Sequence, residues 1–169
     1  MRESAGVADC VGATNVALNI GWLPGLLTLL GDMAKGYLAA ALGKMSSIRI
    51  MPFLMPAFAI AGHNWSLWLR FRGGGGLATF IGGCLAVTDW RMALCGLALW
   101  GLLYLLVRDH DRSAVMACVL LPCATLIAGQ SVETLTFVST SSLTVLLRRL
   151  QSIKERARQW HLYKQRDGK

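Results

Sequence analysis

The residues best suited to chemistry lie in one short stretch, where a histidine, two arginines and a run of glycines follow one another. In order they are His63, which follows Gly62, then Arg70 and Arg72, then Gly73, Gly74, Gly75 and Gly76. Glycine N–H groups can approach an anion closely, and the start of a helix favours negative charge. Forked guanidinium donors suit phosphate oxygens, and a histidine can carry a proton. The stretch predicts a phosphate site, although a flexible loop with two snorkelling arginines fits the same residues.

Two further polar features precede that stretch. Gly12-Ala13-Thr14-Asn15 combines small residues with a hydroxyl and an amide, which can form a loop that donates hydrogen bonds to an anion; an ordinary turn has the same composition. Asp32 and Lys35 lie one turn apart inside an apolar segment. Charged residues inside a membrane helix are normally paired or face a polar cavity. Asp32 and Lys35 therefore either form an ion pair that lowers the cost of inserting the segment into a membrane, or line a site and brace its loops.

The elements that must position these residues are apolar. Of the 169 residues, 54% are hydrophobic and 15% charged, whereas a soluble domain has about 25% charged residues. Backbone groups in lipid must be satisfied internally, and the apolar runs lack the alternation of a barrel strand. We therefore expect an all-α, polytopic membrane helix bundle of about six transmembrane helices. The apolar segments cover residues 22–42, 48–62, 74–88, 92–107, 113–129 and 132–147.

The distribution of positive charge predicts the orientation of this bundle. With six crossings, the side that holds both termini receives thirteen lysine and arginine residues, and the other side receives three. Eight of the thirteen lie in residues 148–169. The positive-inside rule then places both termini in the cytoplasm. We expect a membrane-embedded domain over residues 1–147 and a basic cytoplasmic tail over residues 148–169, which suits either an anionic lipid surface or a soluble partner.

Several other classes of site and function are disfavoured. The five cysteines are odd in number and form no CxxC pair, so neither a disulfide framework nor a metal site is expected. Nucleic acid is not an expected partner, because no basic face alternates with stacking aromatic residues. A channel or transporter is disfavoured because the sequence shows no inverted repeat.

Taken together, the polar features resemble the bacterial acyl-phosphate:glycerol-3-phosphate acyltransferases, the PlsY family. That family carries a GATN loop, a D-x-x-K-G element, a G-H pair, the run FKGGKGVAT and a closing L-R-H segment. The corresponding residues occur here in the same order: Gly12 to Asn15; Asp32, Lys35 and Gly36; Gly62 and His63; Phe71 to Thr79 as FRGGGGLAT; and Leu147, Arg148 and Arg149. The likeness spans about residues 9–155.

The resemblance implies that a fatty acyl group passes from acyl phosphate to glycerol 3-phosphate at the bacterial inner membrane, giving lysophosphatidate without a cofactor or a metal. It implies acyl phosphate, glycerol 3-phosphate and membrane lipids as partners. It also assigns roles to residues of this chain. His63 and Asn15 would be catalytic, Asp32, Lys35 and Arg148 would line or brace the site, and phosphate would be held by Gly12, Thr14, Arg70, Arg72, Gly73, Gly74, Gly76 and Thr79.

Several family positions are substituted. Gly75 stands for the second lysine of the glycine-rich run, Leu18 for an arginine after GATN, and Arg149 for the closing histidine. The family has seven membrane helices, and the first has no counterpart in this sequence. Lost cationic donors weaken phosphate binding, although Arg70, Arg112 or Arg149 would compensate for them if they reach the site. The alternative is a catalytically inactive homologue that binds lipid precursors or partners an active enzyme.

Overall fold

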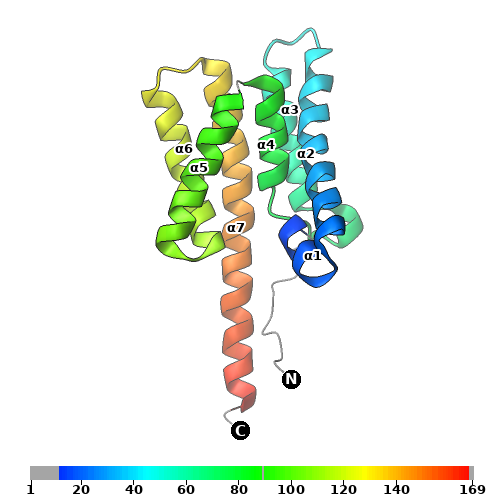
Figure 1. Cartoon of the computed structure of the whole chain (residues 1–169), viewed down its shortest axis with the longest axis vertical. Helices are drawn as coiled ribbons and strands as arrows, with labels where there is room; N and C mark the ends of the chain where they lie inside the picture. The colour runs from blue at the N-terminus through cyan, green and yellow to red at the C-terminus, as the bar shows by residue number, and fades with distance from the viewer. Residues whose placement is uncertain (1–11, 89, 168–169) are drawn as a thin grey trace.

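The computed structural model describes residues 12–88 and 90–167, and over these ranges the regular structure is entirely helical (Figure 1). The elements in chain order are α1 (Ala13–Asn19), α2 (Trp22–Lys44), α3 (Met51–Asn64), the 3-10 turn η1 (Leu67–Leu69), α4 (Leu77–Val87), α5 (Trp90–Val107), α6 (His110–Ile127) and α7 (Val132–Asp167).

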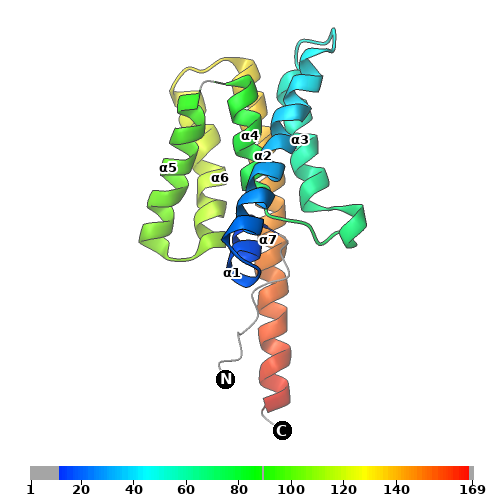
Figure 2. The ribbon, with the colours of Figure 1, turned by 45° about the vertical axis from the view of Figure 1, so that its right-hand side comes forward.

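The long helix α7 joins two groups of helices. On one side α2 packs against α1, α3 and α4, and on the other α5 packs against α6. Helix α7 contacts α3 of the first group and α6 of the second, and it projects beyond both at the end where α1 lies (Figures 1 and 2). The core forms along α7, where Phe137 and Val138 are fully buried and the Phe137 ring stacks on Phe80 at 5.4 Å between centroids.

Glycines bring α2 and α4 unusually close together. A Cβ atom added at Gly36 would lie 1.9 Å from the carbonyl oxygen of Thr79, and one added at Gly82 would lie 1.9 Å from that of Met33. Small residues allow such backbone approach between helices in a membrane. This contact fixes α2 against the start of α4, and with it the position of Asp32, one turn before Gly36.

Each of the six predicted apolar segments corresponds to one helix, from α2 to α7. Two helices differ from expectation. The predicted GATN loop is the short helix α1, and α7 continues through the basic segment as far as residue 167. Two of the described helices, α5 and α6, are long and apolar enough to cross a membrane, by length and composition alone, and the shorter α4 is also apolar. The count of six crossings therefore remains a prediction.

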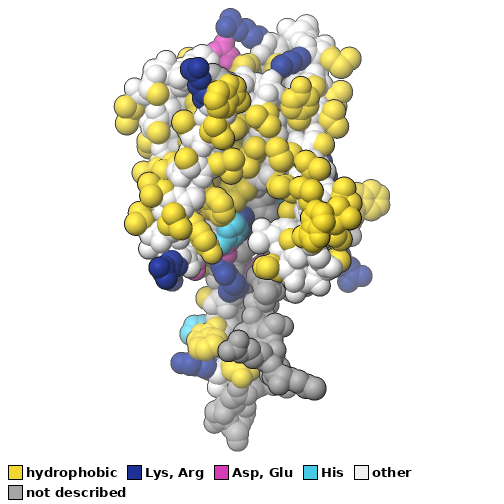
Figure 3. All heavy atoms as spheres, viewed as in Figure 1, with side chains coloured by type: hydrophobic (Ala, Val, Ile, Leu, Met, Phe, Trp, Pro, Cys, Tyr) yellow, Lys and Arg dark blue, Asp and Glu magenta, His cyan; other side chains and the backbone are white. Residues whose placement is uncertain are grey.

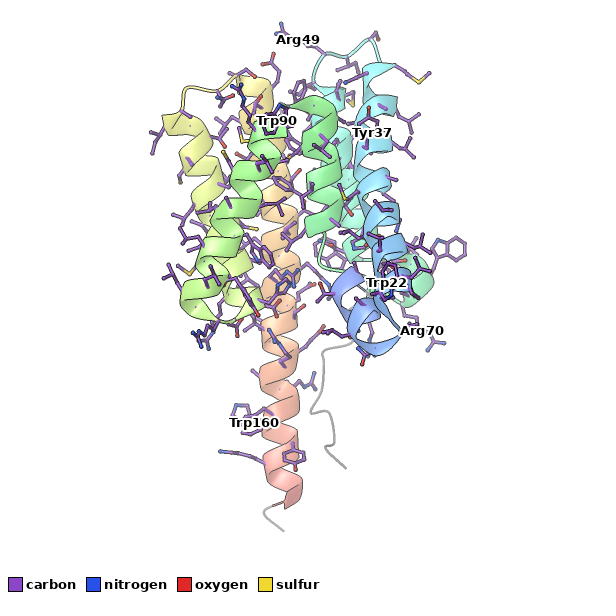
Figure 4. The ribbon with its side chains drawn as sticks, in the orientation of Figure 1. Trp22, Tyr37, Arg49, Arg70, Trp90 and Trp160 are labelled. Atoms are coloured by element: carbon purple, nitrogen blue, oxygen red, sulfur yellow. The ribbon has the colours of Figure 1, made fainter. Side chains whose placement is uncertain are left out.

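Successive connections between the helices lie at alternate ends of the bundle, as the charge count assumes. The connections after α2 and α6 lie at one end, where Arg49 pairs with Glu133 at 2.7 Å. The α3–α4 connection, η1 included, lies at the other end together with α1 (Figures 1 and 4). Between these ends, hydrophobic side chains cover most of the face in Figure 3, whereas lysine and arginine side chains gather toward the two ends. This distribution is typical of a helix bundle in a bilayer.

Candidate active site

A cavity of about 580 Å³ is lined by residues of both groups of helices and of α7. One part of its lining is polar and the other apolar, and α1, α2, α3, α4, α5, α6, α7 and the glycine-rich loop all contribute. The polar residues include Gly12, Thr14, Asn15, Asp32, His63, Gly75, Gly76, Asp111, Arg149, Ser152 and Arg156. The apolar residues include Leu29, Phe80, Ile81, Ala93, Leu97 and Leu121. Such a cavity suits an amphiphilic ligand with an anionic head.

Asp32 connects the polar residues of α2 and α3. Its carboxylate is 5% exposed, and its Oδ1 lies 2.8 Å from Lys35 Nζ and 3.3 Å from His63 Nδ1. The His63 side chain is 8% exposed, whereas the Lys35 side chain is 58% exposed. A carboxylate at Nδ1 fixes the orientation of an imidazole and leaves Nε2 to accept a proton. The contact thus orients the imidazole beside the cavity, with Nε2 packed against Gly74, where an added Cβ atom would lie 2.0 Å from it.

The first two glycines of the loop bind the protein itself. The N–H of Gly73 donates to the Asn64 carbonyl at 3.1 Å, and the N–H of Gly74 donates to the His63 carbonyl at 3.2 Å. On the other side, Arg148 donates to the carbonyl of Gly73 at 3.2 Å and to that of Gly74 at 3.4 Å. The expectation that the Gly73 and Gly74 N–H groups hold phosphate is therefore corrected, because both already bind the end of α3.

The next two glycines face the cavity. Gly75 and Gly76 are among its lining residues, and within residues 12–88 and 90–167 their N–H groups make no hydrogen bond. Gly76 has φ +78°, a left-handed conformation that favours glycine, and α4 begins directly after it. The first N–H groups of a helix have no intrahelical partner. The loop thus ends in backbone donors beside the cavity.

Three predicted phosphate-binding residues lie elsewhere. Arg70 and Arg72 are exposed and are not among the residues that line the cavity, and Arg70 points away from the bundle (Figure 4). The reason is local, because Arg70 and Phe71 have φ of 50° and 64° and turn the chain outward after η1. Thr79 is fully buried and lies against Gly36 in the α2–α4 contact.

The predicted residues of the GATN segment do reach the cavity. Gly12, Thr14 and Asn15 line it from α1, which packs on α2 where a Cβ atom added at Gly25 would lie 2.4 Å from that of Ala17. Asn15 Oδ1 accepts a hydrogen bond from Asn19 at 2.5 Å. Helix α1 therefore supplies hydroxyl and amide groups across the cavity from His63.

The structure shows a charged cluster of which the sequence analysis names only Arg149, as a residue that would compensate for lost cationic donors. Arg149 Nη1 lies 2.6 Å from Asp111 Oδ1, and Arg156 pairs with the other oxygen of the same carboxylate. Asp111 and Arg149 are 6% exposed, and all three residues line the cavity. A sequence signal exists, because residues 149 and 156 are seven apart and share one helix face. This spacing was not used to predict the site, because the sequence analysis assigned residues 148–169 to a basic cytoplasmic tail.

Comparison with known proteins identifies the family of the chain. The model of the glycerol-3-phosphate acyltransferase family matches residues 7–159, which is most of the chain. The chain belongs to this family. A family member of Moorella thermoacetica, glycerol-3-phosphate acyltransferase 1, is 41% identical over 111 residues, which cover 66% of this chain and 56% of that protein. The glycerol-3-phosphate acyltransferase of Synechococcus sp. (strain JA-2-3B'a(2-13)) is 38% identical over 135 residues, covering 80% of this chain and 67% of that protein.

Solved structures of this family have the same fold. Two crystal structures of PlsY, an integral membrane glycerol 3-phosphate acyltransferase, are 26% identical to the chain. The glycerol 3-phosphate form has a TM-score of 0.71 and covers 85% of this chain and 72% of PlsY; the lysophosphatidic acid form has a TM-score of 0.72 and covers 85% and 74%. The present chain is therefore an all-helical integral membrane protein.

Proposed function

We propose that this chain transfers a fatty acyl group from acyl phosphate to glycerol 3-phosphate and releases lysophosphatidate and inorganic phosphate. The observation that carries the proposal is that the His63–Asp32 pair, the glycine-rich loop, the arginines of α7 and an apolar wall all line the same cavity. Family membership supports the same reaction class. No metal is invoked, because the chemistry requires a base, a positioned acceptor and a phosphate leaving group.

His63 is the general base in this proposal. Its Nε2 takes the proton of the glycerol 3-phosphate hydroxyl as the hydroxyl oxygen forms a bond to the acyl carbon. The bond from that carbon to the phosphate oxygen breaks, and phosphate leaves with the electron pair and later receives the proton. Asp32 holds Nδ1 and stabilises the imidazolium that forms. Asn15 and Thr14, which line the same cavity, donate hydrogen bonds to the bound substrates in this proposal.

The polar and apolar parts of the cavity divide the substrates between them. Phosphate groups lie at the edge formed by α1, Gly75, Gly76 and the arginines of α7. The acyl chain lies between Phe80 of α4, Leu97 of α5 and Leu121 of α6, which are lining residues. Burying the chain in this part removes apolar surface from water or the headgroup layer. Much of the acceleration comes from holding two phosphate-bearing substrates side by side.

The orientation in the membrane completes the proposal. The end of the bundle with α1, the α3–α4 connection and the projecting part of α7 faces the cytoplasm of a bacterial cell across its inner membrane. This orientation places the polar edge of the cavity toward water-soluble glycerol 3-phosphate. The thirteen-to-three distribution of basic residues supports it. Residues 148–169 then lie on the cytoplasmic side, and the preceding residues 1–147 form the membrane-embedded domain.

The alternative is an inactive homologue that binds lipid precursors. The observation that favours it is Asp111, whose carboxylate occupies guanidinium donors of both Arg149 and Arg156 inside the cavity. To distinguish the two, the purified protein in detergent is incubated with glycerol 3-phosphate and either acyl phosphate or an acyl thioester. Mass spectrometry then measures lysophosphatidate. The proposal predicts product with acyl phosphate only, whereas absence of product in a folded sample that binds glycerol 3-phosphate supports the alternative.

A further inference from the structure

We infer that Arg149 is the principal phosphate-binding cation of this cavity, and that its guanidinium occupies the space that a side chain at position 75 would take. The inference rests on the proposed function, because it names the residue that holds the phosphate of glycerol 3-phosphate. Arg149 lines the cavity from α7 and is 6% exposed. A buried guanidinium beside a cavity forms stronger hydrogen bonds to an anion than one in water does.

The position of the Arg149 guanidinium is defined by Gly75. A Cβ atom added at Gly75 would lie 2.1 Å from Nη2 and 2.6 Å from Cζ of Arg149, and its three nearest atoms all belong to this guanidinium. The backbone φ of Gly75 is not positive, so a side chain there would conflict with the Arg149 guanidinium rather than with the backbone conformation, and the guanidinium would have to move. The guanidinium therefore lies directly against the glycine-rich loop, beside the backbone donors of Gly75 and Gly76.

Asp111 holds this guanidinium in place without neutralising the cluster. Its carboxylate binds Arg149 through one oxygen and Arg156 through the other, so these two ion pairs, among residues 12–88 and 90–167, join two positive charges to one negative charge. A guanidinium has five N–H donors, so it can hold a carboxylate and a phosphate together. Bidentate donors of this kind suit phosphate oxygens. Asp111 is thus a positioning residue, and Asp111, Arg149 and Arg156 taken together carry a net positive charge.

The other cationic candidates do not meet these conditions. Arg156 lines the cavity, but its side chain is 40% exposed. Arg70 and Arg72 are exposed and lie outside the cavity, and Arg148 is committed to the carbonyls of Gly73 and Gly74. Arg112 does not line this cavity, and its side chain is 73% exposed. The cation at the glycine-rich loop therefore comes from α7 and not from the loop. It follows that a side chain at position 75 and the guanidinium of Arg149 compete for one place.

Direct binding of glycerol 3-phosphate tests this inference without requiring turnover. Isothermal titration of the purified full chain in detergent is expected to show roughly ten- to hundredfold weaker binding for Arg149→Ala. The matched control is Arg158→Gln, which removes the same charge from an exposed position of the same helix and is expected to bind like the wild type. Asp111 keeps Arg156 as a partner in Arg149→Ala, which limits the effect on folding.

A second pair of variants tests the shared space. Gly75→Leu keeps every charge but displaces the guanidinium, so it is expected to weaken binding about as much as Arg149→Ala does. In Gly75→Lys/Arg149→Ala the lysine enters the vacated place, and binding is expected to recover at least partly relative to Arg149→Ala. Thermal unfolding of each variant confirms that the binding data come from folded protein.

The outcomes separate this inference from the proposed reaction. Binding that depends on Arg149 without formation of lysophosphatidate would support the inference and overturn only the reaction. Lysophosphatidate formation with wild-type affinity in Arg149→Ala would overturn the inference and leave the reaction standing. A double variant no better than Arg149→Ala, with Gly75→Leu binding normally, would also overturn it.

Discussion

The Nδ1 atom of His63 lies 3.3 Å from the Oδ1 atom of Asp32, and both side chains are almost completely buried. The two residues come from different helices, α3 and α2, and the α2–α3 packing brings them together. Lys35 binds the same oxygen at 2.8 Å, but its side chain is largely exposed. In the proposed mechanism this contact joins the general base to the carboxylate that orients it, with Lys35 as a peripheral partner.

This relationship predicts different effects for the two partners of Asp32. Asp32→Asn is expected to lower kcat by about a hundredfold or more, because the imidazole loses the carboxylate that holds it and stabilises its charged form. Lys35→Met leaves the Asp32–His63 contact intact and is expected to lower kcat by less than about tenfold. Steady-state phosphate release measures both. Equal losses of kcat in the two variants would show that Asp32 affects kcat through its ion pair with Lys35 and not through His63.

The close approach of α2 and α4 predicts a position-specific loss of stability. Gly36→Ala would place a methyl group against the Thr79 backbone and force the helices apart, at a cost of about 1–3 kcal/mol. Gly31→Ala is the matched control on the same helix, since nothing lies within 4 Å of an added Cβ atom there. Thermal unfolding in detergent followed by circular dichroism should show a lower midpoint for the first variant only. Equal midpoints would exclude the tight contact.

The apolar part of the cavity predicts control of acyl-chain length. Gly96 of α5 lines the cavity, and a Cβ atom there would lie 3.7 Å from Leu121 and 3.8 Å from Phe80, which is ordinary contact. In Gly96→Phe the added ring would fill the space that the chain uses, so activity should shift toward shorter acyl phosphates. Gly101→Phe is the control, because its position on the same helix does not line the cavity. A shift of equal size in both variants would contradict this assignment.

Because Arg70 and Arg72 lie outside the cavity, replacing either one is expected to change activity only slightly. Arg70→Gln and Arg72→Gln should each change kcat/KM for glycerol 3-phosphate by less than about threefold, because exposed charges outside the cavity are screened by solvent and salt. The measurement should be made at moderate ionic strength to limit long-range attraction of the substrate. A loss of a hundredfold in either variant would place that guanidinium at the substrate after all.

The sequence allowed the helices to be located but not their exact limits. Apolar segments from α2 to α6 stand out because backbone groups in lipid require helical hydrogen bonds. The limit of α7 was missed since Lys and Arg are good helix formers, and nothing local marks the end of the bundle. Burial of Arg149 within that basic segment depends on Asp111, 38 residues away in the sequence.

The candidate site was predictable only where its residues belong to local sequence motifs. Asn15, Asp32 and His63 belong to compact motifs, and all three line the cavity. The direction of Arg70 depends on a left-handed backbone that no neighbouring glycine signals. The use of the Gly73 and Gly74 N–H groups depends on the carbonyls at the end of α3, which become visible only when the loop is folded.

The most direct test of the central claim is phosphate release from acyl phosphate by the purified protein as glycerol 3-phosphate is varied, with His63→Ala measured in parallel. We predict saturable release that requires glycerol 3-phosphate, yields an equal amount of lysophosphatidate, and falls by about a hundredfold or more in His63→Ala. Phosphate release that does not depend on the glycerol 3-phosphate concentration, or that is unchanged in a folded His63→Ala protein, would contradict the claim that His63 activates this acceptor.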